Sequence, residues 1–104
     1  MDAAVESKRW WVYIIRTRNA QLYTGITTDI QRRWQEHLSG KGGARYFRAH
    51  IPQAVCFLEQ HSDRSSASKR EAAIKKLAKA EKELLVLSHS LAAGINLSND
   101  PLPG

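Results

Sequence analysis

The chain lacks the features that cross-link a fold or anchor it in a membrane. Only one of its 104 residues is a cysteine, Cys56, which excludes an internal disulfide and a metal site built from cysteines. Cys56 lies in an apolar run, so we expect a buried, inert thiol. No apolar run approaches the ~20 residues that span a bilayer, and residues 1–8 do not resemble a secretory signal. These absences favour a cytoplasmic protein without membrane contact.

Negative charge is also scarce. The chain has 10 Asp and Glu residues against 16 Lys and Arg residues, which leaves a net charge of +6 at pH 7. A basic balance favours an anionic partner, and nucleic acid is the commonest such partner. The length and the 42% hydrophobic content are those of one globular domain with a modest core.

Local patterns predict three strands and three helices. Residues 11–16 and 21–27 are rich in aromatic and β-branched side chains, as is typical of strands. Residues 53–60 form a third strand with an apolar centre. A helical stripe predicts a helix over 29–39, and helical spacing over 67–89 indicates either one bent helix or two short ones. Candidate helix caps follow from short polar side chains: Thr27, Thr28 or Asp29, with Gln31 spaced for a capping box on Thr28, and then Ser65, Ser66 or Ser68.

The order strand, strand, helix, strand, helix, helix predicts an α/β fold. We expect a small three-stranded, mainly antiparallel sheet flanked by three helices. Residues 9–90 are predicted to form this single domain and to act as a monomer. Residues 1–8 and 91–104 are predicted to be flexible termini.

Two tyrosines and a glycine meet in the predicted hairpin. A three-residue turn pairs Thr17 with Gln21 and therefore Tyr13 with Gly25. In that register Tyr13 and Tyr23 share one face of the sheet, and Gly25 leaves an open spot where a ligand approaches the backbone. The alternative is that both tyrosines are ordinary sheet residues with hydroxyls in water.

Charged residues of the helical segments allow two interpretations each. Arg33 and His37 lie four residues apart and share a helix face, where a guanidinium and an imidazole suit an anionic ligand. The alternative is a solvated basic face. Glu71 and Lys75 have the spacing of a helix-stabilising ion pair, but a lone carboxylate also suits a hard cation such as Mg²⁺.

These residues together resemble the GIY-YIG nuclease family. Residues 12–14 read VYI and residues 23–25 read YTG, which is similar to the two half-motifs of the family. Arg33 and His37 match the arginine and histidine of the following helix, and Glu71 matches the carboxylate of the metal-binding helix. The resemblance covers about residues 9–85 and is greatest to small stand-alone bacterial members. It departs at Lys82-Glu83-Leu84, where several members have an asparagine.

The resemblance implies hydrolysis of phosphodiesters with one divalent metal, Mg²⁺ or Mn²⁺. Tyr13 would be the general base, directly or through water, and Tyr23 would orient the attacking water. Arg33 would stabilise charge on the phosphoryl oxygens. Glu71 would hold the metal, and His37 would position or shuttle a proton.

The glycine-rich segment 40–52 is predicted to meet the substrate. Its basic side chains suit phosphates, and Tyr46 or Phe47 suits stacking on a base. The alternative is a mobile connector whose aromatic side chains cover the edge of the core. The predicted nucleic-acid contacts are Gly25, Lys41, Arg45, Tyr46 and Arg48. DNA is the expected partner, without excluding RNA, and cutting is expected to be structure-specific or weakly sequence-specific, in repair or recombination. The alternatives are a non-catalytic nucleic-acid-binding module and a domain that binds an acidic protein.

Overall fold

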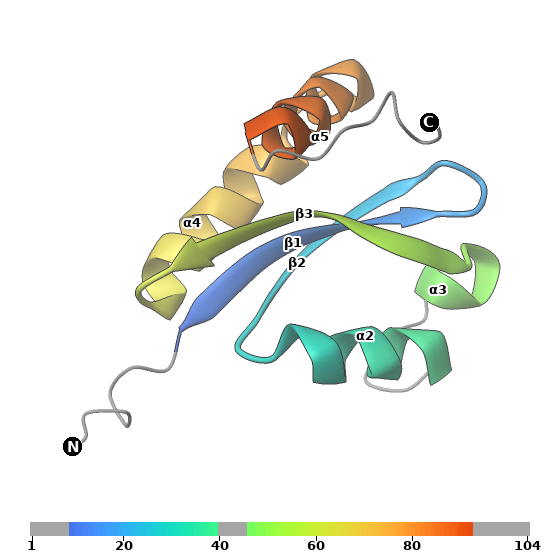
Figure 1. Ribbon diagram of the computed structural model, residues 1–104, viewed down its shortest axis with the longest axis horizontal. Helices are drawn as coiled ribbons and strands as arrows, with labels where there is room; N and C mark the ends of the chain where they lie inside the picture. Colours follow the sequence, from blue (N-terminus) through green and yellow to red (C-terminus); the bar gives the residue numbers. More distant parts are fainter. Residues whose placement is uncertain (1–8, 40–45, 93–104) are drawn as a thin grey trace.

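The structure is a computed structural model that describes residues 9–39 and 46–92. Its elements follow the predicted order, with one addition (Figure 1). They are β1 (Trp10–Thr17), β2 (Leu22–Thr27), α2 (Ile30–Ser39), α3 (Tyr46–Ala49), β3 (Pro52–His61), α4 (Arg64–Lys75) and α5 (Lys79–Ala92). Residues 91 and 92 end α5, so they are helical and not part of a flexible terminus. The remaining residues of the two predicted termini lie outside the described part of the chain.

The three strands form one antiparallel sheet in the order β2-β1-β3. The predicted hairpin register is confirmed, because Tyr13 pairs with Gly25. Thr17 N donates to Gln21 O at 2.9 Å and closes the three-residue turn. Ala20 completes the turn with φ of 64°, a left-handed conformation that L residues rarely adopt.

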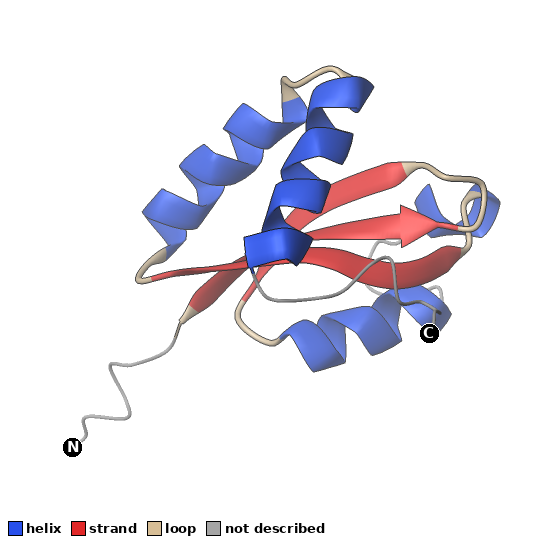
Figure 2. Ribbon diagram, turned by 45° about the horizontal axis from the view of Figure 1, so that its top comes forward, coloured by secondary structure: helices blue, strands red, loops and turns tan. Residues whose placement is uncertain are grey.

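Helices cover both faces of the sheet. Figures 1 and 2 show α4 and α5 over one face, while α2 lies against the other. Strand β1 is central and alternates between the faces, so its apolar residues are buried on both sides. Val12 and Ile14 face α4 and α5 in one core, together with Phe57, Ala67, Ile74 and Val86. Tyr13 and Ile15 belong to a second core with Phe47, against which Tyr23, Ile30, Trp34 and Leu58 pack.

The helix boundaries differ from the predicted ones where capping decides them. Asp29 Oδ1 accepts a bond from Arg32 N at 3.0 Å, and Asp63 Oδ1 accepts one from Ser66 N at 2.8 Å. Of the three candidate caps of α2, Asp29 is therefore the one that caps the helix, and not Thr28. The predicted serine caps of α4 are wrong, because Asp63 is its cap. A carboxylate is at least as good an acceptor for the free amides of a first turn as a hydroxyl. The segment 67–89 is two helices, since α4 ends at its C-cap, Lys76.

Helix α3 is the element that was not predicted. It has four residues within a segment expected to be a loop. Phe47 is buried there with 5% exposure, and this burial accounts for the helical turn better than local propensity does. None of the helices in residues 9–39 and 46–92 has the length and apolar character that a bilayer requires.

Candidate active site

The site is centred on the phenol of Tyr13 in the middle strand. Tyr13 is 1% exposed, and its Oη lies 3.0 Å from His37 Nε2. The ring of Tyr23 lies 6.3 Å from that of Tyr13 and 5.5 Å from that of His37, measured between centroids. The two phenols thus share one face of the sheet, as the register predicts, but Tyr13 is buried and not exposed to water.

Gly25 leaves room for the Tyr13 ring. A Cβ atom built on Gly25 would lie 2.5 Å from Tyr13 Oη and 2.7 Å from Tyr13 Cζ. Real carbon atoms do not approach so closely, so any other residue here would displace the phenol. The space beside Gly25 is therefore filled by Tyr13 and is not the open spot expected from the sequence. A contact of Gly25 with nucleic acid stays a prediction.

Helix α2 brings Arg33 and His37 to the phenol. Its apolar residues Ile30 and Trp34 pack on the sheet, which turns the neighbouring face of the helix toward Tyr13. His37 is 1% exposed, so the interpretation of a solvated basic face is wrong for this residue. Arg33 makes a hydrogen bond to Tyr13 and an ion pair with Glu36, its Nη1 lying 2.9 Å from Glu36 Oε1.

Burial keeps both partners of the Tyr13–His37 pair neutral near pH 7. It raises the pKa of Tyr13 to about 12, against the opposing effect of the Arg33 hydrogen bond. It lowers the pKa of His37 to about 4, with help from the positive charge of Arg33. The pair therefore shares a hydrogen bond between uncharged groups. Arg33 is the group that favours the phenolate.

Two buried polar atoms lack a hydrogen-bond partner among the described residues. They are His37 Nδ1, in the site, and Thr24 Oγ1, on the opposite face of the hairpin. Such atoms are rare in folded proteins and are usually satisfied by ordered water or by a ligand. His37 therefore has one nitrogen bonded to Tyr13 and one that buried water would satisfy.

Phe47 follows the second of its two interpretations. Its ring lies 4.4 Å from the His37 ring and 4.8 Å from the Tyr23 ring, measured between centroids. Stacking of Phe47 on a nucleobase is therefore wrong, because the ring is buried against these two residues. The alternative, an aromatic side chain that covers the edge of the core, is confirmed for Phe47. Its ring excludes water from one side of the imidazole.

Glu71 forms the ion pair that the sequence suggested, and its role as a metal ligand stays a prediction. Its Oε2 lies 3.1 Å from Lys75 Nζ, the expected ion pair along α4. Its negative charge also raises the pKa of Tyr13, which places the carboxylate within electrostatic range of the phenol. No group of three or more His, Cys, Asp or Glu that could hold a metal occurs in residues 9–39 and 46–92. A single carboxylate nonetheless fits Mg²⁺, which keeps several waters and takes substrate phosphate as a ligand.

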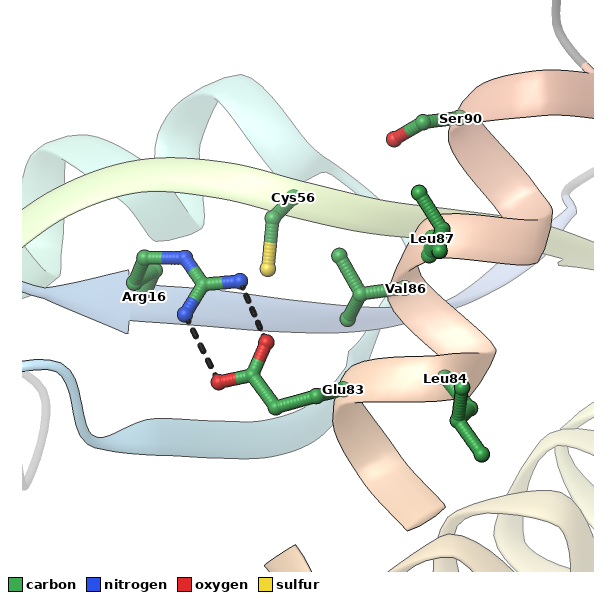
Figure 3. Close-up of a pocket in the computed structure, with 7 residues that line it drawn as sticks. All are labelled: Arg16, Cys56, Glu83, Leu84, Val86, Leu87 and Ser90. Carbon is green, nitrogen blue, oxygen red and sulfur yellow. Dashed lines mark hydrogen bonds and ion pairs between the residues drawn. The ribbon is translucent and has the colours of Figure 1, made fainter. Parts of the chain in front are cut away.

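The position near the missing family asparagine has a structural role here. Figure 3 shows the Glu83 carboxylate bound to the Arg16 guanidinium by two hydrogen bonds of 2.8 and 2.9 Å. Arg16 projects to the face of β1 opposite Tyr13, so this pair ties α5 to the sheet away from the phenols. The pair borders a cavity of about 460 Å³ that Cys56 also lines. Cys56 is half-buried and not fully buried as expected, and burial raises its pKa.

The remaining predicted contacts lie mostly beyond the described side chains. Arg48 is exposed on α3. Lys41 and Arg45 lie outside the described residues, and the position of the Tyr46 side chain is likewise not described. The described site therefore consists of Tyr13, Tyr23, Gly25, Arg33, His37 and Phe47, with Glu71 within electrostatic range.

Two phenols of the sheet, a guanidinium and a histidine of α2 and a nearby carboxylate of α4 are the groups expected of a nuclease catalytic domain. A family model described as "GIY-YIG catalytic domain" matches residues 9–84, and the chain belongs to the GIY-YIG family. The family resemblance expected from the sequence is confirmed, and so is the three-stranded α/β fold.

Several small proteins resemble this chain over most of its length. The UPF0213 protein DP2720 of Desulfotalea psychrophila is 51% identical over 77 residues, which cover 74% of this chain and 70% of that protein. The UPF0213 protein YhbQ of Escherichia coli is 44% identical over 84 residues, which cover 81% and 83% respectively. The solution NMR structure of the UPF0213 protein BH0048 from Bacillus halodurans has 31% identity and a TM-score of 0.55, covering 88% of this chain and 96% of that one.

Proposed function

We propose that this protein is an endonuclease that hydrolyses phosphodiester bonds in DNA with a divalent metal, Mg²⁺ or Mn²⁺. The observation that carries this proposal is the buried Tyr13–His37 hydrogen bond with Arg33 bonded to the same phenol. The domain acts as a monomer over residues 9–90 in the cytoplasm. It cuts by nucleic-acid structure or with weak sequence preference, in repair or recombination.

Tyr13 and His37 together accept the proton of the attacking water. Water attacks phosphorus, and the bond from phosphorus to the leaving oxygen breaks. Tyr13 Oη, directly or through a second water, accepts the proton of the attacking water and passes its own proton to His37 Nε2. The high pKa of Tyr13 and the low pKa of His37 both oppose this transfer in the free protein. Arg33 opposes the burial effect on Tyr13 and stabilises the charge that gathers on the phosphoryl oxygens. Tyr23 orients the attacking water.

Glu71 is the residue that would hold the cation. One carboxylate would leave most coordination positions of the cation to water and phosphate oxygen, which suits Mg²⁺ or Mn²⁺. When bound, the cation polarises the phosphate and stabilises the leaving oxygen. Contacts with the phosphates come from the basic side chains Lys41, Arg45 and Arg48, and Tyr46 stacks on a base. Gly25 contributes by giving Tyr13 its place.

The experiment is a panel of labelled duplex, flapped and branched DNA and matched RNA, with Mg²⁺ and with Mn²⁺. We expect the unchanged chain to cut at least one flapped or branched DNA and Glu71→Gln to lose this activity by at least about a hundredfold. Lys75→Ala is the matched control, since it breaks the same ion pair but keeps the carboxylate. It should cut at nearly the unchanged rate. Equal rates for Glu71→Gln and Lys75→Ala would reduce Glu71 to a helix-stabilising residue.

A second function is a nucleic-acid-binding module without turnover. It is favoured by one observation, the engagement of Glu83 with Arg16 near the position where several family members have asparagine. Tight, salt-sensitive binding of DNA without cleavage of any substrate in the panel would support it. Binding insensitive to salt would instead favour an acidic protein as the partner.

A further inference from the structure

Two adjoining recesses lie along α2, and neither belongs to the site around Tyr13. One, of about 290 Å³, is lined by Ile30, Gln31, Trp34, Val55 and Leu58. The other, of about 530 Å³, is lined by Asp29, Gln31, Arg32, Trp34 and Gln35. Gln31 and Trp34 line both, so the recesses form one groove with an apolar part and a polar part. We call it the Trp34 groove.

The apolar part of the groove leaves apolar side chains open to solvent. Trp34 and Ile30 are only partly buried although they pack on the second core. Val55 is 37% exposed on the same rim. An aromatic ring set among aliphatic side chains and open to solvent is the usual lining of a small-ligand pocket, and the volume is near the lower end of such pockets, roughly 300 Å³. It suits one flat, apolar ring.

The polar part of the groove suits the phosphate and the polar base edge of a nucleotide. Arg32 has 63% side-chain exposure, and its Nε is 4.0 Å from Glu36, a loose ion pair that leaves the guanidinium able to meet a phosphate. Asp29 carries the opposing charge, but its Oδ1 already accepts a bond from Arg32 N. The amide of Gln31 can both donate to and accept from a base edge. The net charge of +6 favours a polyanion as the occupant.

The groove and the candidate active site are both built on α2. Arg32 and Trp34, which line the groove, are the sequence neighbours of Arg33, which is bonded to Tyr13. A nucleic acid that contacts Arg33 therefore lies within the width of one helix from the groove. A paired base is held in the duplex, so only an unpaired one can enter.

We propose that the Trp34 groove binds one unpaired nucleotide of the nucleic-acid substrate, with the base against Trp34 and Val55 and the phosphate at Arg32. This inference rests on the proposed function and names its substrate class: DNA with a flap, bulge or single-stranded arm. It gives the protein a means of recognising branched structure without reading sequence.

Binding of flapped DNA by the full chain tests the groove independently of cleavage. All variants carry Glu71→Gln, and affinity is measured by fluorescence anisotropy without divalent metal. A series of flaps carries one abasic nucleotide at each position in turn. We expect one position where losing the base weakens binding roughly 5- to 100-fold, the range for base stacking on an aromatic side chain.

Val55→Glu and Leu84→Glu are the matched pair of variants. Both replace an exposed apolar residue, with 37% and 63% exposure, and both change the net charge equally, but Leu84 lies on α5 across the sheet. Val55→Glu should abolish the difference between the base and abasic flaps, and Leu84→Glu should keep it. Trp34→Phe should keep part of it, and its thermal unfolding reports whether the fold is intact.

The outcomes separate the groove from the proposed function. Base-dependent binding that Val55→Glu alone removes supports the groove, even if the unchanged chain cuts nothing. The groove proposal is overturned if abasic flaps bind as tightly as complete flaps at every position. It is also overturned if Val55→Glu and Leu84→Glu show the same difference between the two kinds of flap. Cleavage of flapped DNA by the unchanged chain would then still support the nuclease.

Discussion

At the scale of the residue, the site depends on one missing side chain. Gly25 pairs with Tyr13 across the hairpin, and the phenol fills the volume that a Cβ atom would need. Glycine is required here for space, since no positive φ is found at this position. The half-motif glycine is thus part of the placement of Tyr13.

Replacing Gly25 by alanine is expected to displace the Tyr13 ring and break its 3.0 Å contact with His37 Nε2. Cleavage should fall by at least about tenfold, and overpacking should lower the free energy of unfolding by about 1–3 kcal/mol. Single-turnover cleavage and urea unfolding measure the two effects. A Gly25→Ala variant with unchanged cleavage rate and unchanged stability would contradict the claim that Gly25 is needed to place the Tyr13 phenol.

His37 makes stability depend on pH. Its pKa is about 4 in the folded protein against 6.5 for an ordinary histidine, so between these values the unfolded chain binds more protons. Stability is therefore fully present above about pH 6.5 and is lost as pH falls toward 4, by an amount on the order of 3 kcal/mol. Urea unfolding from pH 4.5 to 7.5 measures it. His37→Gln should flatten the profile across this window, whereas His89→Gln, on the other face of the sheet, should keep the His37 contribution.

At the scale of the element, the hairpin was predictable because local chemistry decides it. Aromatic and β-branched residues mark both strands, and a three-residue turn fixes which residues pair. Asp29 was one of three adjacent candidate caps for α2, and Asp63 was missed as the cap of α4. In both places several oxygen-bearing side chains stand side by side, and only the backbone path selects among them. Helix α3 was missed because it depends on burying Phe47 against His37 and Tyr23, which lie 10 and 24 positions away in the chain.

The turn of the hairpin carries strain that a single substitution should relieve. Ala20 has φ of 64°, where an L residue is disfavoured by roughly 1–2 kcal/mol and glycine is not. Ala20→Gly should therefore raise the free energy of unfolding by up to about 1 kcal/mol, after the greater entropy of the unfolded glycine is subtracted. Ala73→Gly, at an exposed position inside α4, should lower it by about 1 kcal/mol. Thermal unfolding of both variants decides; a loss of stability in Ala20→Gly would contradict the prediction.

At the scale of the whole molecule, the sequence predicted which residues meet but not their protonation. Tyr13, Tyr23, Arg33 and His37 converge because the hairpin register and one helix face bring them together, and both are local patterns. Arg33 acts to lower the phenol pKa, yet burial dominates and raises the pKa of Tyr13 to about 12. The depth of a side chain depends on the whole fold, as the packing of Phe47 shows. The same holds for the bond between Arg16 and Glu83, 67 residues apart.

The central claim is that Tyr13 and Glu71 serve one phosphodiester at one site. A double-mutant cycle with Tyr13→Phe and Glu71→Gln tests it most directly, through single-turnover cleavage of flapped DNA at saturating protein. Groups that act as a unit are far from additive, so each single variant should lose most of the activity and the double variant little more than the worse single one. Losses that multiply, or a single variant that cuts at nearly the unchanged rate, would contradict the shared site.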